Sequence, residues 1–516
     1  MALQNLPIGI QNFESLRADG YLYVDKTEIV YRLATSGRYY FLSRPRRFGK
    51  SLLLSTLHAY FEGKRELFDG LAVSRLETKW EQHPVLHLDL NTRNYKDAEA
   101  LTGILNEYLE KWEAVYGDAK KDRVLEERFT YVIEQAYART GHRVVILVDE
   151  YDKPMLQAIG NEALQDEYRS ILQSFYSALK TCDGYIRFAM LTGVTKFGKL
   201  SVFSSLNSLN DISMDWQFHG ICGITDEELD TVFPAYTQRL AERNRMSVAE
   251  ARERLRTLYD GYHFFENSEG VYNPFSLLNT FAKQTFGSYW FATGTPTYLV
   301  KLLRLHDYNL QSLSDEYVTE DILNSIDVAS TNPVPVIYQS GYLTIKGYEP
   351  RFRTYKLGFP NEEVEDGFFR FLLPFYTSVN KIEAPFHIQK FVSEIESGQP
   401  EAFLNRLKSF FADTPYELVK NLENHYQNVL YILCKLLGLY VKAEYHTSTG
   451  RIDMVLQTKD YTYVLEFKLD GTAEEALQQI QDKSYALPFE TGATRVFRIG
   501  LNFSSETRNI EKWVMD

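Results

Sequence analysis

The chain has 516 residues, a formal net charge of −13 at pH 7, 44% hydrophobic and 24% charged residues. This length exceeds what one compact core holds, so about two to four domains are expected, with the composition of an ordinary globular protein. The negative charge excludes a global electrostatic reason to bind nucleic acid, so such binding requires a local basic surface. Three widely spaced cysteines exclude a disulfide framework and a cysteine-rich zinc site, and they favour a reducing compartment.

The sequence predicts neither a signal peptide nor a membrane-spanning segment. The N-terminal twenty residues contain polar and charged interruptions rather than a continuous apolar core, so they do not resemble a signal peptide. The most apolar region, Val429–Val441, is interrupted by Lys435 and is too short to span a bilayer. We therefore expect a cytoplasmic protein that makes no membrane contact.

The stretch 38–57 combines a buried strand, a tight loop and a helix. Tyr39–Leu42 predicts the strand, and the helix follows Gly49, Lys50 and Ser51. This context is typical of a phosphate-binding loop, where free backbone N–H groups at the helix N-terminus hold phosphates. Glycine lets the backbone approach closely, lysine reaches the outer phosphates, and the serine hydroxyl can hold Mg²⁺.

One position departs from the usual pattern, because Arg44 stands where the first glycine is expected. The alternative interpretation is an ordinary strand-to-helix turn with a solvated basic tip. The predicted loop consists of Arg44, Pro45, Arg46, Arg47, Phe48, Gly49, Lys50 and Ser51.

A second stretch, 143–154, supplies the complementary acids. Val144–Val148 are apolar and mostly β-branched, which predicts a central strand of a parallel sheet. Asp149 and Glu150 then emerge at the carboxyl end of the strand, where ligands bind in open α/β sheets. In P-loop enzymes the aspartate holds Mg²⁺ and a following glutamate can polarise the attacking water. The two stretches in this order predict ATP binding.

Between and around these motifs the pattern alternates between strands and helices, which predicts a five-stranded parallel sheet in three layers. Thr192, at the end of a strand, is a candidate sensor of the γ-phosphate, with simple capping of a helix or turn as the alternative. The other predicted strands are Pro84–Leu90, Tyr185–Leu191 and Gly220–Ile224, and the predicted helices are Thr27–Ala34, Ala98–Glu113, Val124–Arg139 and Ala163–Leu179.

The middle of the chain is mostly helical. Residues 226–291 predict a helical lid. Residues 316–358 predict two short helices followed by a hairpin, formed by Gly341–Lys346 and Arg353–Leu357, which suggests a winged-helix module. Such modules can read DNA or dock proteins, and docking is favoured here.

The last hundred residues form a second unit with its own chemistry. In Glu466-Phe467-Lys468 the period of two places the acid and the lysine on one face of a strand. Asp453, on the neighbouring strand, is expected to face Glu466 across a Mg²⁺ ion, with Lys468 orienting the attacking water. Exposed surface charges are the alternative. The predicted elements are helices Glu423–Leu437 and Thr472–Leu487 and strands Leu439–Tyr445, Arg451–Gln457, Tyr461–Lys468 and Thr494–Leu501.

Two further residues are expected at the same cleft. Gln481 and Tyr485 lie one helical turn apart within the predicted helix. Because this region carries a complete set of strands and helices, a fragment that starts near Lys420 is expected to fold alone.

With both sites identified, the chain resembles, nearly end to end, the prokaryotic AAA-ATPase-like proteins that carry a C-terminal PD-(D/E)XK nuclease-superfamily domain. In that group an arginine at the position of Arg44 is usual. This chain departs from the family pattern before Asp453, where Ile452 stands in place of a proline. The matching stretches are YVDKT (23–27), RPRRFGKS (44–51), LVDEYDKP (147–154), YDGYHF (259–264), YNPFSL (272–277), QSGYLTIK (339–346), FPNEEV (359–364), GRID (450–453) and EFK (466–468).

This resemblance implies an ASCE-type P-loop ATPase core followed by a small nuclease-like fold. It implies that Lys50, Ser51, Asp149 and Glu150 serve ATP and Mg²⁺. It also implies a nuclease triad, with two accessory positions, at the C-terminal end of the chain. These residues are Asp453, Glu466 and Lys468, with Gln481 and Tyr485 as the accessory positions.

The sequence thus predicts an α/β protein with four regions: a P-loop ATPase core (1–225), a helical lid (226–300), a winged-helix-like and helical middle region (301–420) and a nuclease-like domain (421–516). The leading hypothesis is an ATP-controlled, Mg²⁺-dependent nuclease that acts on DNA, with defence against foreign DNA as a guess at its role. The alternative is a nucleotide switch or scaffold whose C-terminal fold binds partners or nucleic acid without cutting. A homo-oligomer is left open.

Overall fold

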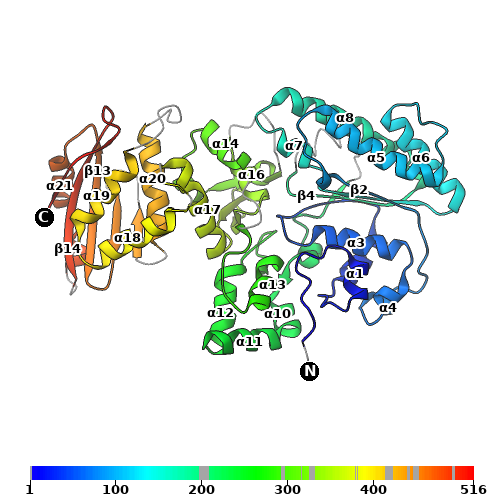
Figure 1. Cartoon of the computed structure of the whole chain (residues 1–516), viewed down its shortest axis with the longest axis horizontal. Coiled ribbons are helices and arrows are strands. Elements are labelled where there is room, and N and C mark those ends of the chain that lie inside the picture. Colours follow the sequence, from blue (N-terminus) through cyan, green and yellow to red (C-terminus); the bar gives the residue numbers. More distant parts are fainter. Residues whose placement is uncertain are drawn as a thin grey trace. The chain divides into compact units, whose positions relative to one another are not determined.

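The computed structural model describes residues 3–196, 209–291, 297–314, 316–324, 332–377, 379–380, 382–412, 422–438, 442–445, 453–490 and 494–516. The chain forms two compact units, and each of them is assembled from two separate stretches of sequence (Figure 1). The first unit comprises Met1–Gly294 and Asp315–Glu363, and the second comprises Thr295–Ser314 and Val364–Asp516. Within the described residues, no helix is both long and apolar enough to cross a membrane.

The first unit is built on a five-stranded parallel sheet with the order β2-β3-β4-β1-β5. Figure 1 shows α1 and α3 on one face of this sheet and α5, α6 and α8 on the other, which makes the predicted three layers. The strands are β1 (Tyr39–Ser43), β2 (Val85–Asp89), β3 (Val144–Asp149), β4 (Ile186–Gly193) and β5 (Asn210–Asp211), and the helices are α1 (Phe13–Ala18), α3 (Lys50–Phe61), α5 (Ala98–Tyr116), α6 (Leu125–Thr140) and α8 (Glu162–Thr181).

The sheet places the P-loop strand and the acidic strand on either side of β4. Every residue of β1 and of β3 is buried, as expected for strands covered on both faces. Their carboxyl ends, at Ser43 and Asp149, therefore lie at the same edge of the sheet.

The prediction of a strand at Gly220–Ile224 is wrong. Its first two residues end a short 3₁₀ helix, η4 (Trp216–Ile221), and only its last residue lies in a strand, β6 (Ile224–Thr225). β6 pairs with β7 (Val271–Tyr272) in a separate two-stranded sheet. The fifth strand of the main sheet is instead β5, whose two polar residues offer no apolar pattern that a sequence analysis can detect.

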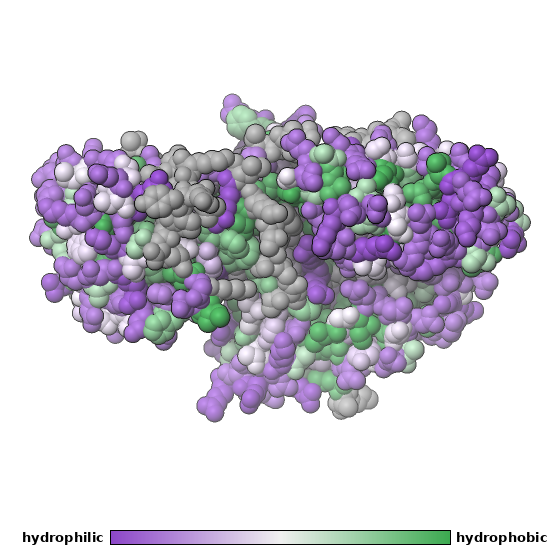
Figure 2. Space-filling view, turned by 45° about the horizontal axis from the view of Figure 1, so that its top comes forward, coloured by the Kyte–Doolittle hydropathy of each residue, from purple (hydrophilic) through white to green (hydrophobic). Residues whose placement is uncertain are grey.

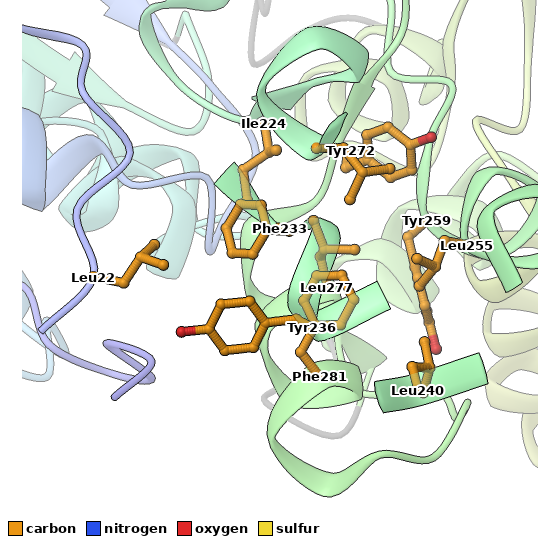
Figure 3. Close-up of a cluster of buried hydrophobic side chains, with 11 residues drawn as sticks. Leu22, Ile224, Phe233, Tyr236, Leu240, Leu255, Tyr259, Tyr272, Leu277 and Phe281 are labelled. Atoms are coloured by element: carbon orange, nitrogen blue, oxygen red, sulfur yellow. The ribbon is translucent and has the colours of Figure 1, made fainter. Parts of the chain in front are cut away.

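The helical segment after the sheet has its own apolar core (Figure 3). The rings of Phe233 and Phe281 stack with their centroids 5.3 Å apart, and Leu22 from the N-terminal segment packs into the same cluster. Capping boxes begin two of the helices, at Thr225 with Glu228 and at Ser247 with Glu250. The helices are α10 (Asp226–Val232), α11 (Pro234–Asn244), α12 (Val248–Tyr259) and α13 (Pro274–Lys283).

The predicted pair of short helices and the hairpin are present in the first unit. A short strand precedes them and joins the hairpin, so that an antiparallel sheet with the order β8-β10-β9 results. The winged-helix assignment stays a prediction. The elements are β8 (Tyr317–Thr319), α15 (Glu320–Asn324), α16 (Val334–Gln339), β9 (Thr344–Glu349) and β10 (Thr354–Gly358).

The second unit contains a five-stranded mixed sheet with the order β11-β12-β13-β14-β15, in which only β13 and β14 run parallel. In Figure 1, α21 lies on one face of this sheet and α18, α19 and α20 lie on the other. The strands are β11 (Lys442–Tyr445), β12 (Met454–Gln457), β13 (Tyr461–Leu469), β14 (Arg495–Ser504) and β15 (Asn509–Met515).

Helices from well upstream complete this unit. They are α14 (Thr297–Leu305), α17 (Glu362–Tyr376), whose first two residues belong to the first unit, α18 (Ala384–Glu396), α19 (Pro400–Phe411) and α20 (Leu422–Leu437), followed after β13 by α21 (Ala473–Asp482) and α22 (Leu487–Glu490). The sequence analysis missed β15, because only Ile510 of that edge strand is fully buried and no apolar alternation marks it.

The surface of the molecule in Figure 2 is mostly hydrophilic, with hydrophobic residues in scattered patches.

Candidate active sites

The predicted phosphate-binding loop (P-loop) joins β1 to α3, in the expected order of strand, loop and helix. Gly49 caps α3 with a left-handed backbone (φ +96°), which glycine adopts at no steric cost. The Lys50 side chain is only 4% exposed, and its Nζ donates to the carbonyl oxygens of Arg44 (3.1 Å) and Pro45 (3.4 Å). Ser51 lies in the first turn of the helix and is half-buried. The ammonium of Lys50 is therefore held over the loop by the loop's own backbone.

Side chains anchor the glycine-poor half of the loop to the rest of the first unit. The ring of Phe48 is buried edge-on against Tyr262 (4.7 Å between centroids), and the Arg44 guanidinium stacks on Phe264 at 3.8 Å. Arg46 and Arg47 are exposed. Three further contacts fix the loop: Trp290 Nε1 donates to the Arg46 carbonyl (3.1 Å), Arg47 lies 5.0 Å above the ring of Phe275, and a Cβ atom at Gly341 would lie 2.5 Å from Pro45 Cβ.

The acidic residues of β3 lie next to this loop. Asp149 is buried, and its Oδ1 accepts hydrogen bonds from the Thr192 hydroxyl (2.6 Å) and the Glu150 N–H (3.0 Å). Glu150 has a left-handed backbone (φ +52°), which is uncommon outside glycine, and its Oε1 lies 3.3 Å from Lys50 Nζ. Thr192 thus positions Asp149, and its predicted contact with a γ-phosphate stays a prediction.

Two acids near Asp149 were missed. Asp152 is fully buried and accepts hydrogen bonds from the Thr195 N–H (2.6 Å) and hydroxyl (2.5 Å), which ties the end of β3 to the end of β4. Burial, and then the charge of Glu150, raise the pKa of Asp152 above its ordinary value. Asp89 is the partner of Asp149 in the β2–β3 ladder. Asp152 lies in the motif around β3, and its closeness to two other acids is the signal that could have revealed it.

The predicted nuclease triad comes together on β13 and just before β12. Asp453 Oδ2 accepts a hydrogen bond from the Phe467 N–H at 2.8 Å, which fixes it beside the strand that carries Glu466 and Lys468. Glu466 is 2% exposed, and its Oε1 lies 3.9 Å from Lys468 Nζ. Ile452, which stands where the family has proline, lies outside the described residues.

Burial makes both carboxyl groups weak acids. It raises the pKa of Asp453 to about 6 and that of Glu466 to about 7, with the charge of Asp453 as the second cause for Glu466. The Lys468 ammonium acts in the opposite direction on both. Among the described residues, the buried Oε2 of Glu466 has no hydrogen-bond partner. A buried carboxylate oxygen without a partner, next to a second carboxylate, is the donor set that a hard divalent cation prefers.

A residue that the sequence analysis missed connects the acid and the lysine. Gln479 on α21 donates from Nε2 to Glu466 Oε1 and accepts through Oε1 from Lys468 Nζ. The structure does not bring Gln481 to this group, because residues two positions apart point to nearly opposite sides of a helix and Gln481 is exposed. Tyr485 lies beyond the end of α21, where it packs with Val464 and Ile480 in an apolar cluster.

Comparisons with known proteins match the two predicted sites to two different protein families. A family described as predicted AAA-ATPase matches residues 7–203, and the PD-(D/E)XK nuclease superfamily matches residues 421–513. The fold and the sites thus define a P-loop ATPase-like protein with a nuclease-superfamily domain.

Over its full length the chain is also similar to a protein of Azotobacter chroococcum mcd 1, recorded as an uncharacterized protein in the vnfD 5′ region. The two are 37% identical over 536 residues, which cover 100% of this chain and 99% of that protein. The chain belongs to this family of AAA-ATPase-like proteins with a C-terminal PD-(D/E)XK nuclease-superfamily domain.

Proposed function

We propose that this protein hydrolyses ATP at the P-loop and cleaves DNA with Mg²⁺ at the C-terminal site, and that the nucleotide state governs cleavage. The matched domains support an ATPase and a nuclease-like function in general terms. The observation that carries the nuclease half is the group of Asp453, Glu466, Lys468 and Gln479, in which one buried carboxylate oxygen has no partner.

At the P-loop, the Lys50–Glu150 pair is the resting arrangement. When a phosphate group enters, Lys50 exchanges the Glu150 carboxylate for phosphate oxygens, and Glu150 becomes free to orient the attacking water. Asp149 and Ser51 would hold Mg²⁺, which neutralises phosphate charge when bound. Thr192 keeps Asp149 in place for this role through its hydroxyl.

At the C-terminal site, Asp453 and Glu466 would hold the metal ion, which supplies positive charge beside the scissile phosphate when bound. Lys468 orients the attacking water and takes part in stabilising the phosphate. Gln479 holds the Lys468 ammonium and the Glu466 carboxylate through one hydrogen bond each, so it positions both without acting on the substrate itself.

The test uses purified full-length protein with plasmid and single-stranded DNA, in Mg²⁺ or Mn²⁺, with and without ATP. We expect cleavage by the wild type. We expect its loss in Asp453→Ala, Glu466→Gln and Lys468→Ala, with ATP hydrolysis retained in all three variants. Lys468→Ala should keep its affinity for the metal, since the ammonium is not a ligand.

Two results would contradict the proposal. Cutting that persists in Asp453→Ala would place the nuclease activity elsewhere. A wild type that binds DNA or a partner but never cuts, under any metal or nucleotide condition, would instead support the switch or scaffold.

A further inference from the structure

The side chain of Arg44 is buried, and no acidic side chain among the described residues pairs with it. It is 1% exposed, and its Nη1 donates to the carbonyl oxygens of Ser43 (2.9 Å) and Ser213 (2.7 Å). The ring of Phe264 covers one face of the guanidinium. Among the described residues, its Nε and Nη2 have no hydrogen-bond partner. Burial lowers the pKa of Arg44 to about 10, so the group still carries its charge at neutral pH.

These two nitrogens form the side-on fork with which arginine binds anions. The same chain uses this fork twice in the expected way. Arg128 donates from Nε and Nη2 to the two oxygens of Glu113, both at 2.7 Å, and Arg252 donates in the same way to Asp230, both at 2.8 Å. In Arg44 the same fork is more deeply buried, and no carboxylate from the described part of the chain occupies it.

Arg44 lines a cavity of about 30 Å³ inside the first unit. None of the residues that line it is acidic, and a second cation, Lys196, lies at its wall. Lys196 is paired with Asp211 at 2.9 Å, so the nearest acid is already engaged. Among the residues proposed to bind ATP or Mg²⁺, only Arg44 and Pro45 reach the cavity, so it is distinct from the phosphate site.

We propose that this cavity binds one small monovalent anion, of the size of chloride or formate, on the Nε and Nη2 fork of Arg44. A water molecule can accept these hydrogen bonds but cannot neutralise a buried guanidinium, whereas an anion does both. The space suits a single small ion and excludes a nucleotide.

The position of the cavity gives the anion a structural role. Its walls come from the start of the P-loop, from Tyr262–Phe264 and from Tyr338–Thr344. The anion therefore joins the P-loop to the helical segment and to the hairpin module within the first unit. Its binding stabilises this junction, because a ligand that binds only the folded state raises the free energy of unfolding.

The test measures thermal unfolding of the full-length protein at constant ionic strength, with gluconate replaced stepwise by chloride, bromide or formate. We expect a saturable rise of about 2–4 °C in the Tm of the first unit's transition. Arg44→Met should lose this rise. Arg128→Met, which removes a fork that Glu113 already fills, should lower the Tm and keep the rise. A larger rise with formate than with the halides would identify a two-oxygen anion, and the reverse order a halide; both results support the site.

A second measurement does not depend on any variant. Crystals of the wild type grown in bromide should show an anomalous peak within hydrogen-bonding distance of Arg44 Nε and Nη2. The proposal is overturned if the wild type shows no saturable rise, if Arg44→Met keeps the full rise, or if only water lies at the fork in bromide. If Arg44→Met does not fold, Arg44→Lys, which keeps the charge and removes the fork, takes its place, and the crystal decides.

Discussion

At the scale of single residues, the Lys50–Glu150 ion pair is the interaction that nucleotide binding is expected to change most directly. Both charges are largely removed from water. A substitution that removes one of them therefore leaves the other charge buried and unpaired. We expect Lys50→Ala to lose ATP binding, because the phosphates lose their principal side-chain partner. We expect Glu150→Gln to bind ATP but to hydrolyse it about 10²–10⁴-fold more slowly.

Binding of a fluorescent ATP analogue and phosphate release measure these two effects separately. Lys26→Ala is the control, since Lys26 belongs to a different partly buried ion pair, with Glu228 at 2.6 Å. Equal ATP binding by the wild type and Lys50→Ala would remove the P-loop assignment.

Gln479 and Gln481 form a natural pair for testing the nuclease site. Gln479→Leu removes both hydrogen bonds that hold Glu466 and Lys468, so we expect cleavage to fall about 10–100-fold and the apparent affinity for Mg²⁺ to weaken. Gln481→Leu, on the exposed side of the same helix, should leave both unchanged. Cleavage rates over a Mg²⁺ titration decide the matter, and an equal loss in both variants would contradict the role of Gln479.

His425 predicts a dependence of stability on pH in the second unit. Burial lowers its pKa to about 4, below the ordinary value of 6.5, and its Nε2 has no partner among the described residues. The unfolded chain therefore binds the proton first, and the free energy of unfolding rises with pH between about 4 and 6.5 and is level above.

His425→Phe keeps the ring that stacks near Tyr376 and removes this titration. Relative to the wild type, the free energy of unfolding of the variant should be higher at pH 4.5 than at pH 8 by about 2–3 kcal/mol. Denaturant unfolding at both pH values measures the difference, and the exposed His142→Phe is the control. A gain independent of pH would show that packing alone is responsible.

At the scale of elements, the sequence predicted what burial imposes on a pattern. The runs at 39–42 and 144–148 are apolar throughout because both faces of β1 and β3 are covered, and they were found with nearly correct ends. β5 and β15 were missed because backbone pairing rather than side-chain burial defines them. At the C-terminal site, strand geometry predicted that Asp453 and Glu466 lie together. The position of Gln479 could not be predicted, because the choice between residues 479 and 481 depends on how α21 is rotated about its axis, and only its packing determines that rotation.

Gly500 controls that packing. It is the ladder partner of Glu466, and a Cβ atom there would lie 2.2 Å from the Ala473 carbonyl oxygen and 2.4 Å from the Leu477 nitrogen of α21. Gly500→Ala should therefore displace α21, lower the stability of the second unit by about 1–3 kcal/mol and reduce cleavage with Gln479 unchanged.

Thermal unfolding and cleavage assays measure these two effects. Gly184→Ala is the matched control, because a Cβ atom at that position has nothing within 4 Å. If Gly500→Ala were as stable and active as the control, the close packing of α21 on β14 would not determine the site.

At the scale of the whole molecule, the C-terminal sheet depends on helices that precede the nuclease-superfamily match. The Tyr463 hydroxyl donates to the Ile395 carbonyl at 2.7 Å, and Phe411 packs edge-on against Phe503. A fragment of residues 421–516 lacks α18 and α19 and exposes this apolar face. We expect residues 364–516 to unfold cooperatively at a Tm well above that of residues 421–516.

Circular dichroism and calorimetry of the two fragments test this expectation. An equal Tm for both would show that the sheet and α20 suffice, as the sequence analysis expected for a fragment that starts near Lys420.

The discontinuous composition of the two units has a consequence for how the protein is taken apart. The chain passes between the units three times, after Gly294, Ser314 and Glu363. A protease cut at any single crossing leaves two fragments that both contribute to at least one of the units. Such a nicked protein should migrate as two bands in denaturing gels and elute as one species under native conditions. A single cut at one of these crossings is therefore not expected to separate the two units.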